Sequence, residues 1–322
     1  MRVVEFSHFG DPSQLRLVDR PDPKADASTA IVQIVAASVN PSDVKNVAGR
    51  MHQTTLPRVP GRDFSGVVVD GPAEWIGQEV WGTGGDVGFT RDGSHAEFIA
   101  VPRSSLVHKP QSLTHEEAGS AGVTFLTAWC AVSEYASLQA GETMVIIGSR
   151  GGVGGAAAQI AKHLRARVIG VNRRVETASK EDIPIEDLIL DSRDPKLPDI
   201  LRSMNDGRGA DVVLNAAGGP MFEIGLSLLA HRGRQVEITS PTARRTAFDL
   251  VDFYHNESRL FGLDTLKRDL VASARILERL ADGFASGVYR PHKVAKILPL
   301  KDARQAYEEV AKGVSGRMIL KM

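Results

Sequence analysis

The stretch Glu142–Asn172, ETMVIIGSRGGVGGAAAQIAKHLRARVIGVN, decides the fold of the middle part of this chain. Its apolar run Met144–Ile147 ends at a glycine, as a short buried parallel strand does. A glycine-rich turn, Gly148–Gly155, follows directly, then Ala156–Leu164 has helix-forming composition, and Arg167–Val171 resumes strand character. This order predicts a strand–turn–helix–strand unit, whose turn can hold the pyrophosphate of a dinucleotide at the N-terminus of its helix.

The turn departs from the GxGxxG pattern at its first glycine, which is Ser149, while Gly151 and Gly154 stay in register. A tight turn that binds nothing is the alternative interpretation. The surrounding strands and helix favour the dinucleotide, because this context is what the pattern requires. The residues expected around the phosphates are Ser149, Arg150, Gly151, Gly152, Val153 and Gly154.

The residues after the second strand indicate which dinucleotide binds. NAD-binding units usually place a carboxylate there to accept hydrogen bonds from the ribose 2′-OH. This chain has Asn172, Arg173 and Arg174, so we expect no carboxylate to repel a 2′-phosphate and two guanidinium groups to bind it. The sequence therefore predicts NADPH. In the alternative interpretation, both arginines are solvated charges.

Length and composition limit the class of protein. The 322 residues are enough for one large or two medium domains. Lys plus Arg and Asp plus Glu both number 39, so a nucleic acid or an anionic membrane is not expected as a partner. The one cysteine, Cys130, cannot form an intrachain disulfide, which fits a reducing, cytoplasmic compartment. We expect no signal peptide and no membrane span, because the N-terminus lacks an apolar core and no run is long enough.

Residues up to about Val101 have the pattern of an irregular β-rich domain with Gly and Pro turns. Strands are expected at Ala30–Val39, Phe64–Val69, Glu79–Trp81 and His95–Val101. Thr114 and Glu117 form a capping-box pattern that starts a helix. A second helical region, Thr124–Ala136, leads into the glycine-rich unit.

From the glycine-rich unit to about residue 282, strands and helices alternate, which predicts a doubly wound parallel sheet. The expected elements are the strands Asp211–Asn215, Arg234–Thr239 and Leu260–Leu263 and the helix Phe222–Leu229. The tail differs, with strands at Val294–Leu298 and Arg317–Lys321 around a helix, Lys301–Lys312, that has Ala303, Ala306, Tyr307 and Val310 on one stripe. We expect the tail to return to the first domain.

The whole layout resembles the medium-chain dehydrogenase/reductase superfamily, and within it the zinc-free quinone oxidoreductases. Its landmarks are ASVNPSDVKNVAG (37–49), VPGRDFSGVV (59–68), GSHAEFIAV (93–101), GVTFLTAW (122–129), GSRGGVGGAAAQIAK (148–162), DVVLNAAGG (211–219) and GRMILKM (316–322). The resemblance implies an α/β fold with a GroES-like β domain (1–122 and 289–322), a Rossmann domain with a doubly wound parallel sheet (123–288), an active site in the cleft between them, and a homodimer.

The zinc-dependent branch of that superfamily carries a cysteine near Asn40–Ser42 and Gly-His-Glu where this chain has Gly61-Arg62-Asp63. It often also has four closely spaced cysteines. This chain lacks all of these residues, so we expect no metal site. The resemblance then implies hydride transfer from NADPH to a quinone or an α,β-unsaturated carbonyl, small molecules that delocalise the charge they receive.

The resemblance also implies roles for individual residues. Asn40 and Asp43 are expected at the floor of the active site, although Asp43 could instead cap a helix over Val44–Ala48. Thr124 and Thr127 are expected at the nicotinamide ribose and phosphates, with a helix cap as the alternative for Thr124. The remaining cofactor contacts are expected at two strand ends, Asn215, Ala216 and Ala217 at one and Thr239 and Ser240 at the other.

Two other functions stay open at this point. NPSD and VNRR also resemble 2-enoyl-thioester reductases, but those enzymes use a tyrosine where this chain has Met51, with His52 beside it. The second alternative is a non-catalytic NADPH-binding protein with a sensory or structural role.

Overall fold

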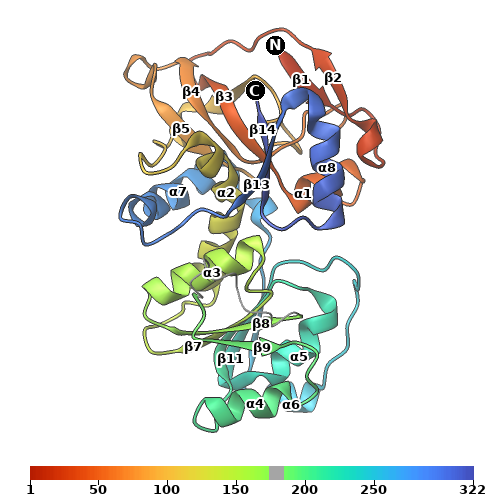
Figure 1. The fold of residues 1–322 in the computed structure, drawn as a ribbon, viewed down its shortest axis with the longest axis vertical. Coiled ribbons are helices and arrows are strands. Elements are labelled where there is room, and N and C mark those ends of the chain that lie inside the picture. Colours follow the sequence, from red (N-terminus) through yellow and green to blue (C-terminus); the bar gives the residue numbers. More distant parts are fainter. Residues whose placement is uncertain (174–184) are drawn as a thin grey trace. The chain divides into compact units, whose positions relative to one another are not determined.

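The computed structural model describes residues 1–173 and 185–322, which form two compact units. The first unit is Met1–Leu126 with Thr265–Met322, and the second is Thr127–Asp264 (Figure 1). Helix α7 (Leu270–Ala285) belongs to the first unit, where Phe284 packs edge-on against Trp81 with ring centroids 5.7 Å apart. The sequence-based boundaries assign this helix to the Rossmann domain, and those boundaries stay a prediction.

The first unit is built on a six-stranded sheet in which β3 is central. Strands β13, β14, β3, β4 and β5 follow one another across the sheet, and β6 also pairs with β3. A separate antiparallel pair is formed by β1 and β2. The bounds of these strands are β1 Arg2–Glu5, β2 Arg16–Asp19, β3 Thr29–Val39, β4 Phe64–Asp70, β5 Glu79–Gly82, β6 Phe98–Pro102, β13 Val294–Pro299 and β14 Arg317–Lys321.

The C-terminal tail returns to the first unit, as the sequence predicts. Strand β14 pairs antiparallel with the second half of β3, with Met318 opposite Val39 and Leu320 opposite Ala37. These four side chains are almost completely buried. The last strand therefore supplies part of the core of the unit that the N-terminal strands begin.

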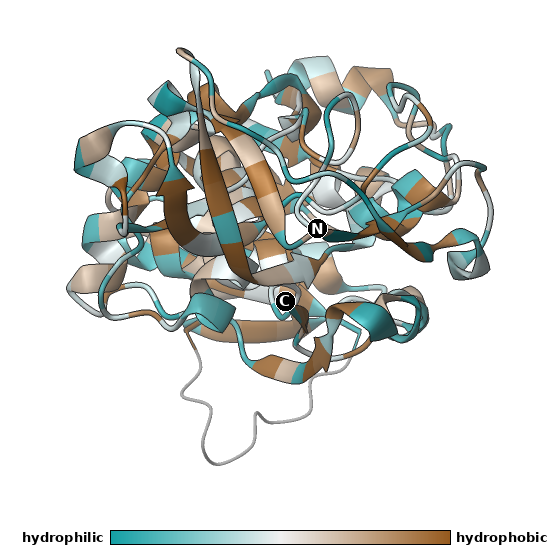
Figure 2. Ribbon diagram, turned by 90° about the horizontal axis from the view of Figure 1, so that it is seen from above, coloured by the Kyte–Doolittle hydropathy of each residue, from teal (hydrophilic) through white to brown (hydrophobic). Residues whose placement is uncertain are grey.

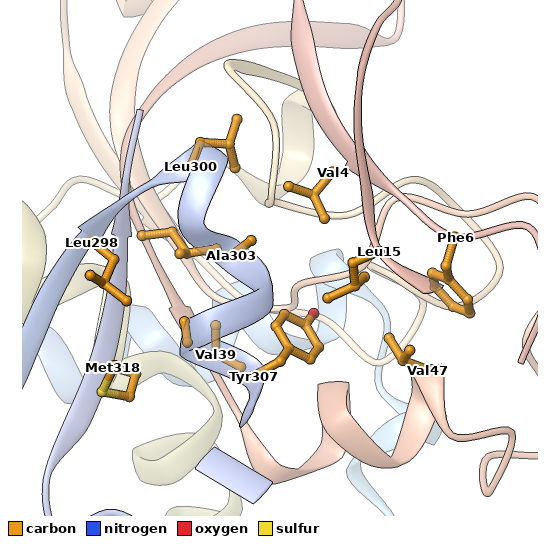
Figure 3. Packing of buried hydrophobic residues seen from close by; sticks show 12 residues of the cluster. Val4, Phe6, Leu15, Val39, Val47, Leu298, Leu300, Ala303, Tyr307 and Met318 are labelled. Atoms are coloured by element: carbon orange, nitrogen blue, oxygen red, sulfur yellow. The ribbon is translucent and has the colours of Figure 1, made fainter. Parts of the chain in front are cut away.

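Helix α8 (Ala303–Lys312) covers part of that sheet with the stripe predicted from its sequence. Ala303, Ala306 and Tyr307 are fully or almost fully buried, and Val310 packs against the same cluster. Figure 3 shows the Tyr307 ring among apolar side chains from β1, β3, β13 and the helix α1 (Pro41–Val47).

One continuous helix replaces the two helical segments expected around residue 120. Helix α2 runs over His115–Trp129 and continues into a π-helical turn at Cys130–Tyr135. Thr114 precedes it, and Glu117 accepts a hydrogen bond from the Thr114 N–H at 2.8 Å, which confirms the capping box. Cys130 is buried and forms no disulfide.

The second unit is a doubly wound parallel sheet, as predicted. Its strand order is β12-β11-β10-β7-β8-β9, and every neighbouring pair is parallel. This is the strand order of a Rossmann fold. The order in which strands are added to the sheet reverses between β7 and β10, and sheets of this kind bind their ligands at that point. The bounds are β7 Thr143–Ile147, β8 Arg167–Asn172, β9 Leu188–Asp191, β10 Ala210–Asn215, β11 Leu229–Glu237 and β12 Arg259–Gly262.

Helices cover both faces of this sheet. Helix α3 (Gly152–His163) lies on one side, and α4 (Leu197–Met204), α5 (Phe222–Ser227) and α6 (Leu250–His255) lie on the other (Figure 1). Figure 2 shows that strands are largely hydrophobic, whereas hydrophilic residues concentrate in loops and on helices. No helix of the described residues is both long enough and apolar enough to pass through a bilayer.

Two elements of this unit differ from the sequence prediction. Strand β11 begins at Leu229, five residues before the predicted start, because Leu229 is buried and pairs with Ala210. Strand β9 was not predicted, since Leu188–Asp191 is a short segment with polar neighbours. It nevertheless completes the sheet beside β8.

Candidate active site

The glycine-rich turn of the second unit joins β7 to α3 through backbone hydrogen bonds. Gly148 has φ +85° and donates its N–H to the Val171 carbonyl at 2.8 Å. The Gly151 N–H donates to the Gly148 carbonyl at 3.0 Å, and Gly151 is the N-cap of α3, with no side-chain cap. The first-turn N–H groups of α3 therefore have no intrahelical acceptor and can bind an anion.

The two glycines in register have different surroundings. A Cβ atom on Gly154 would lie 2.1 Å from the Gly148 carbonyl oxygen, inside the packing of the turn. A Cβ atom on Gly151 would meet only that same oxygen, at 3.3 Å, and Gly151 is exposed. The chain thus leaves open space beside Gly151, whereas Gly154 lets the helix approach the strand.

Ser149 is buried within the turn and does not face the solvent. Its hydroxyl accepts a hydrogen bond from Asn172 Nδ2 at 2.9 Å and donates to the carboxylate of Glu186. Ser149 and Asn172 are buried, and a Cβ atom on Gly170 would lie 2.4 Å from the Ser149 hydroxyl. The expectation that no carboxylate reaches this end of the sheet is therefore wrong, because Glu186 comes from the segment before β9.

The basic residues expected at the 2′-phosphate are only partly described. Arg173 is exposed directly after β8, and Arg150, which is expected at the turn itself, is also exposed. The Arg150 N–H donates to Asn172 Oδ1 at 3.4 Å, so Asn172 links the turn to the strand end. Arg174 lies outside the described residues.

The end of β10 lies beside the glycine turn. The Ala216 N–H donates to the carbonyl of Ile147, the last residue of β7, at 3.0 Å. The next two N–H groups, of Ala217 and Gly218, donate to Asn215 Oδ1 at 3.1 and 3.0 Å. Asn215 is completely buried, so its side chain shapes the loop beside the glycine turn.

That loop packs against the segment after β11. The Gly219 N–H donates to the Ser240 hydroxyl at 3.1 Å, and a Cβ atom on Gly218 would lie 2.7 Å from the Thr239 carbonyl oxygen. The structure therefore brings together Asn215, Ala216, Ala217, Thr239 and Ser240, the five residues that the sequence assigns to two strand ends.

A second carboxylate lies at the same edge of the sheet. Glu237 ends β11 and accepts hydrogen bonds from Asn215 Nδ2 on both oxygens at 3.0 Å. Gln235 Nε2 also donates to Glu237 Oε1, at 2.7 Å. Burial raises the pKa of Glu237, and these amide donors oppose that rise.

Thr124 and Thr127 both lie on α2. The Thr124 hydroxyl donates to the Ala121 carbonyl at 3.0 Å, one turn back within the helix, so Thr124 is not a helix cap. Both threonines are buried. Their expected role at the cofactor stays a prediction.

In the first unit, Asn40 belongs to a buried polar network. Its Nδ2 donates to Asp63 Oδ2 at 3.0 Å, and its Oδ1 accepts from the guanidinium of Arg317. The Ser38 hydroxyl donates to Asp63 Oδ2 at 3.1 Å and accepts from Arg317 Nη2 at 3.0 Å. The ends of β3, β4 and β14 are thereby tied together, and burial lowers the pKa of Arg317 while both nearby carboxylates oppose this.

Asp43 takes part in capping α1, as the alternative for this residue predicts, but from within the first turn: Asn40 is the N-cap, and Asp43 is the third residue of the helix and completes a capping box. Its Oδ2 accepts the Asn40 N–H at 2.8 Å, and the helix begins at Pro41, three residues before the predicted start. Proline is favoured at this first helical position. Burial raises the pKa of Asp43 to about 7, although the Asn40 N–H and Arg62 lower it.

His95 and Tyr307 form a buried pair close to these groups. The Tyr307 hydroxyl lies 3.0 Å from His95 Nδ1, and His95 Nε2 lies 3.2 Å from the Ser38 carbonyl. Burial lowers the pKa of His95 to about 4, and burial together with the Asp43 charge raises the pKa of Tyr307. Both side chains are therefore neutral near pH 7.

The residues where the zinc branch holds its metal do not fit a cation. Arg62 is buried and donates to the Gly84 carbonyl at 3.0 Å. Asp63 Oδ1 accepts the Val123 N–H at 2.8 Å, and its Oδ2 lies 3.7 Å from Arg317 Nη2. Across residues 1–173 and 185–322, no three His, Cys, Asp or Glu side chains gather into a metal-binding group.

Sequence reasoning missed three charged residues of these sites. Arg317 is 277 residues from Asn40, and its only sequence signal is its place in the GRMILKM landmark. Glu186 precedes β9, a strand that the sequence does not predict, and Glu237 ends β11, whose limits were predicted incorrectly. A correct C-terminal limit for β11 would have placed Glu237 at the carboxyl edge of the sheet, where Rossmann folds bind ligands.

The chain matches two domain families. Residues 26–111 match the alcohol dehydrogenase GroES-like domain, and residues 152–279 match zinc-binding dehydrogenases. A zinc-type alcohol dehydrogenase-like protein of Schizosaccharomyces pombe is 30% identical over 308 residues, which cover 94% of this chain and 90% of that protein.

Two further comparisons agree with these matches. A quinone oxidoreductase of Sus scrofa is 27% identical over 335 residues, which cover 99% of this chain and 97% of that protein. The solved structure of an NAD-dependent alcohol dehydrogenase has a TM-score of 0.88 and 26% identity, with all of both chains covered.

Proposed function

Because the chain belongs to the medium-chain dehydrogenase/reductase superfamily, in its quinone oxidoreductase-like branch, we propose that this oxidoreductase uses NADPH to reduce a quinone or an α,β-unsaturated carbonyl without a metal ion. Use of a nicotinamide dinucleotide and a small-molecule substrate follows from the family. The observation that carries the cofactor proposal is the open approach to Gly151 at the N-terminus of α3.

The chain's own groups would hold the dinucleotide along the carboxyl edge of the parallel sheet. We propose that the backbone N–H groups of Gly152 and Val153, in the first turn of α3, bind the pyrophosphate. Arg150 and Arg173 supply positive charge beside it, which favours the extra phosphate of NADPH. The Asn215 loop and the Thr239–Ser240 segment are proposed to hold the nicotinamide end.

When bound, NADPH supplies a hydride to an electron-poor carbon of the acceptor. Reduction of a conjugated acceptor suits a site without a metal, because the acceptor spreads the incoming charge over its own oxygen. The residues at the zinc position support this proposal, since Arg62 is a cation and Asp63 already accepts hydrogen bonds on both oxygens. Asn40 is proposed to orient the acceptor or the nicotinamide.

The decisive experiment has two stages. Fluorescence titration should first show tighter binding of NADPH than of NADH. NADPH oxidation is then followed with ortho- and para-quinones, simple enones and a 2-enoyl thioester. Turnover with quinones or enones supports the proposal, whereas turnover confined to the thioester would replace it with 2-enoyl-thioester reduction.

Two results bear on the remaining expectations. Preference for NADH over NADPH would overturn the cofactor proposal while leaving the family unchanged. The resemblance also predicts a homodimer, and sedimentation velocity of the purified protein checks that prediction.

A further inference from the structure

A negative charge is held at the carboxyl end of β11 without a cationic partner in the described part of the chain. The Glu237 carboxylate accepts from Asn215 Nδ2 at 3.0 Å on both oxygens and from Gln235 Nε2 at 2.7 Å on one. Asn215 and Gln235 are completely buried, and both donors are neutral amides. Among residues 1–173 and 185–322, no lysine or arginine forms an ion pair with Glu237.

The Glu237 carboxylate lies in the half of the sheet that is expected to bind the nicotinamide nucleotide. A Rossmann sheet has two mononucleotide-binding halves, with the ribose of the adenosine half held at the end of the second strand. That strand is β8, which ends at Asn172, so β10, β11 and β12 form the nicotinamide half. Asn215 and Glu237 end two of these three strands, at the carboxyl edge, where open sheets of this kind bind ligands.

We propose that the Glu237 carboxylate sets the relative affinity of this protein for oxidised and reduced cofactor, in favour of the oxidised form. The inference rests on the proposed use of NADPH. Loss of a hydride, with its electron pair, leaves one positive charge on the nicotinamide ring, and the phosphates do not change. A fixed negative charge in this half of the site therefore acts on the difference between the two forms.

The consequence follows from linkage between binding and reaction. A group that makes the protein bind NADP⁺ more tightly than NADPH also makes bound NADPH a stronger hydride donor. The reason is that cofactor binding and hydride transfer form one thermodynamic cycle. Neutral amides suit this role, since an arginine paired with Glu237 would cancel its field. The three hydrogen bonds from Asn215 and Gln235 keep the carboxylate in place at the strand end.

The test measures dissociation constants for NADP⁺ and NADPH by isothermal titration calorimetry on the full-length protein. Glu237→Gln removes the charge and keeps the size of the side chain. We expect the ratio Kd(NADP⁺)/Kd(NADPH) to rise about 3- to 10-fold, as expected for one charge acting across several ångströms of protein.

Two variants serve as controls. Glu237→Asp keeps the charge and should keep a ratio near that of the wild type, even if both affinities fall. Glu257→Gln removes a carboxylate that pairs with Arg232 at the opposite end of β11, and it should leave the ratio unchanged.

The failure of this inference and that of the proposed function have different signatures. An unchanged ratio in Glu237→Gln, or an equal rise in Glu237→Asp, would overturn the electrostatic role of Glu237 while NADPH binding remains. A wild-type protein that binds neither nucleotide would overturn the proposed function and this inference with it.

Discussion

Gly154 lies so close to Gly148 that a Cβ atom on Gly154 would come within 2.1 Å of the Gly148 carbonyl oxygen. The same test at Gly151 gives 3.3 Å to that oxygen and no other neighbour within 4 Å. One glycine of the turn therefore serves the fold, and the other leaves room for a ligand.

This difference separates two substitutions that the sequence alone treats alike. Gly151→Val should abolish NADPH binding and change the melting temperature little, because its side chain occupies only the ligand space. Gly154→Val should destabilise the second unit by about 1–3 kcal/mol or more, as overpacking does. Calorimetric melting and fluorescence titration of both variants check this, and an unchanged NADPH affinity in Gly151→Val would contradict the placement of the phosphates.

Replacing Arg173 and Arg174 together by Ala should weaken NADPH binding by about 2–4 kcal/mol, because hydrogen bonds to charged groups contribute roughly 1.5–3 kcal/mol each. NADH binding should barely change.

Glu186→Gln should have the opposite effect on cofactor preference and raise the preference for NADPH over NADH, since a carboxylate near Ser149 repels a phosphate. If titrations show equal changes in NADPH and NADH affinity, neither the two arginines nor Glu186 interacts with the 2′-phosphate.

Asn40→Ala should lower turnover roughly 10- to 100-fold, about 1.4–2.7 kcal/mol of barrier, with little change in NADPH affinity. The same change removes hydrogen bonds to Asp63 and Arg317, so stability should also fall by about 1–3 kcal/mol. Turnover and urea unfolding must therefore be measured on one preparation. Arg317→Lys is the matched variant, because it disturbs the network and leaves Asn40 in place. If it lowers turnover as much as Asn40→Ala, Asn40 has no role of its own in the reaction.

Asp43 should make the first unit less stable as the pH rises from about 4 to 7. Its pKa is raised from 3.8 to about 7 in the folded protein, so across this window the folded state holds a proton that the unfolded state has lost. The contribution is complete below pH 3.8 and is lost as the pH rises through 7. Asp43→Asn can still accept the Asn40 N–H and lacks this titration.

The measurement is urea unfolding of both proteins at several pH values. The stability of Asp43→Asn relative to wild type should increase between pH 4 and 7 and stay level above pH 7. The lowered pKa of His95 makes both proteins less stable as the pH falls from 6.5 to 4, so its effect cancels in the difference. A difference that does not vary with pH would mean that Asp43 titrates normally.

Reductase turnover should persist after treatment with EDTA or phenanthroline, and elemental analysis should find no stoichiometric metal. The reason is the chemistry of the position, where Arg62 stands in place of a ligand and Asp63 is occupied by hydrogen bonds. Activity that is lost on chelation and regained with zinc would place the protein in the metal-dependent branch.

The sequence predicts features that short-range patterns determine. The turn at Gly148–Gly155, the parallel strands around it and the buried stripe of α8 depend on neighbours a few residues apart, so their periodicity is visible. The predicted fold class is confirmed by the parallel sheet of the second unit and the GroES-like domain match of the first, and the return of the tail by the pairing of β14 with β3.

Charged groups brought in from distant segments could not be predicted in the same way. Arg317 reaches Asn40 only because two strands pair across most of the chain, and Glu186 reaches Ser149 from a segment whose strand has a weak pattern. Their side chains meet through tertiary packing, which local propensity does not encode. Glu237 was within a predicted strand, yet its partners Asn215 and Gln235 depend on the register of β10 and β11.

The position of β14 beside the second half of β3 also matters while the chain is being synthesised. Ribosomes synthesise the chain from the N-terminus, so the edge of β3 at Ala36–Val39 stays unpaired until Arg317–Lys321 have been synthesised. The second unit is one continuous segment, Thr127–Asp264, and can fold during that delay. A nascent chain therefore exposes an apolar strand edge until Arg317–Lys321 have emerged, and this is the period in which a chaperone would protect it from aggregation.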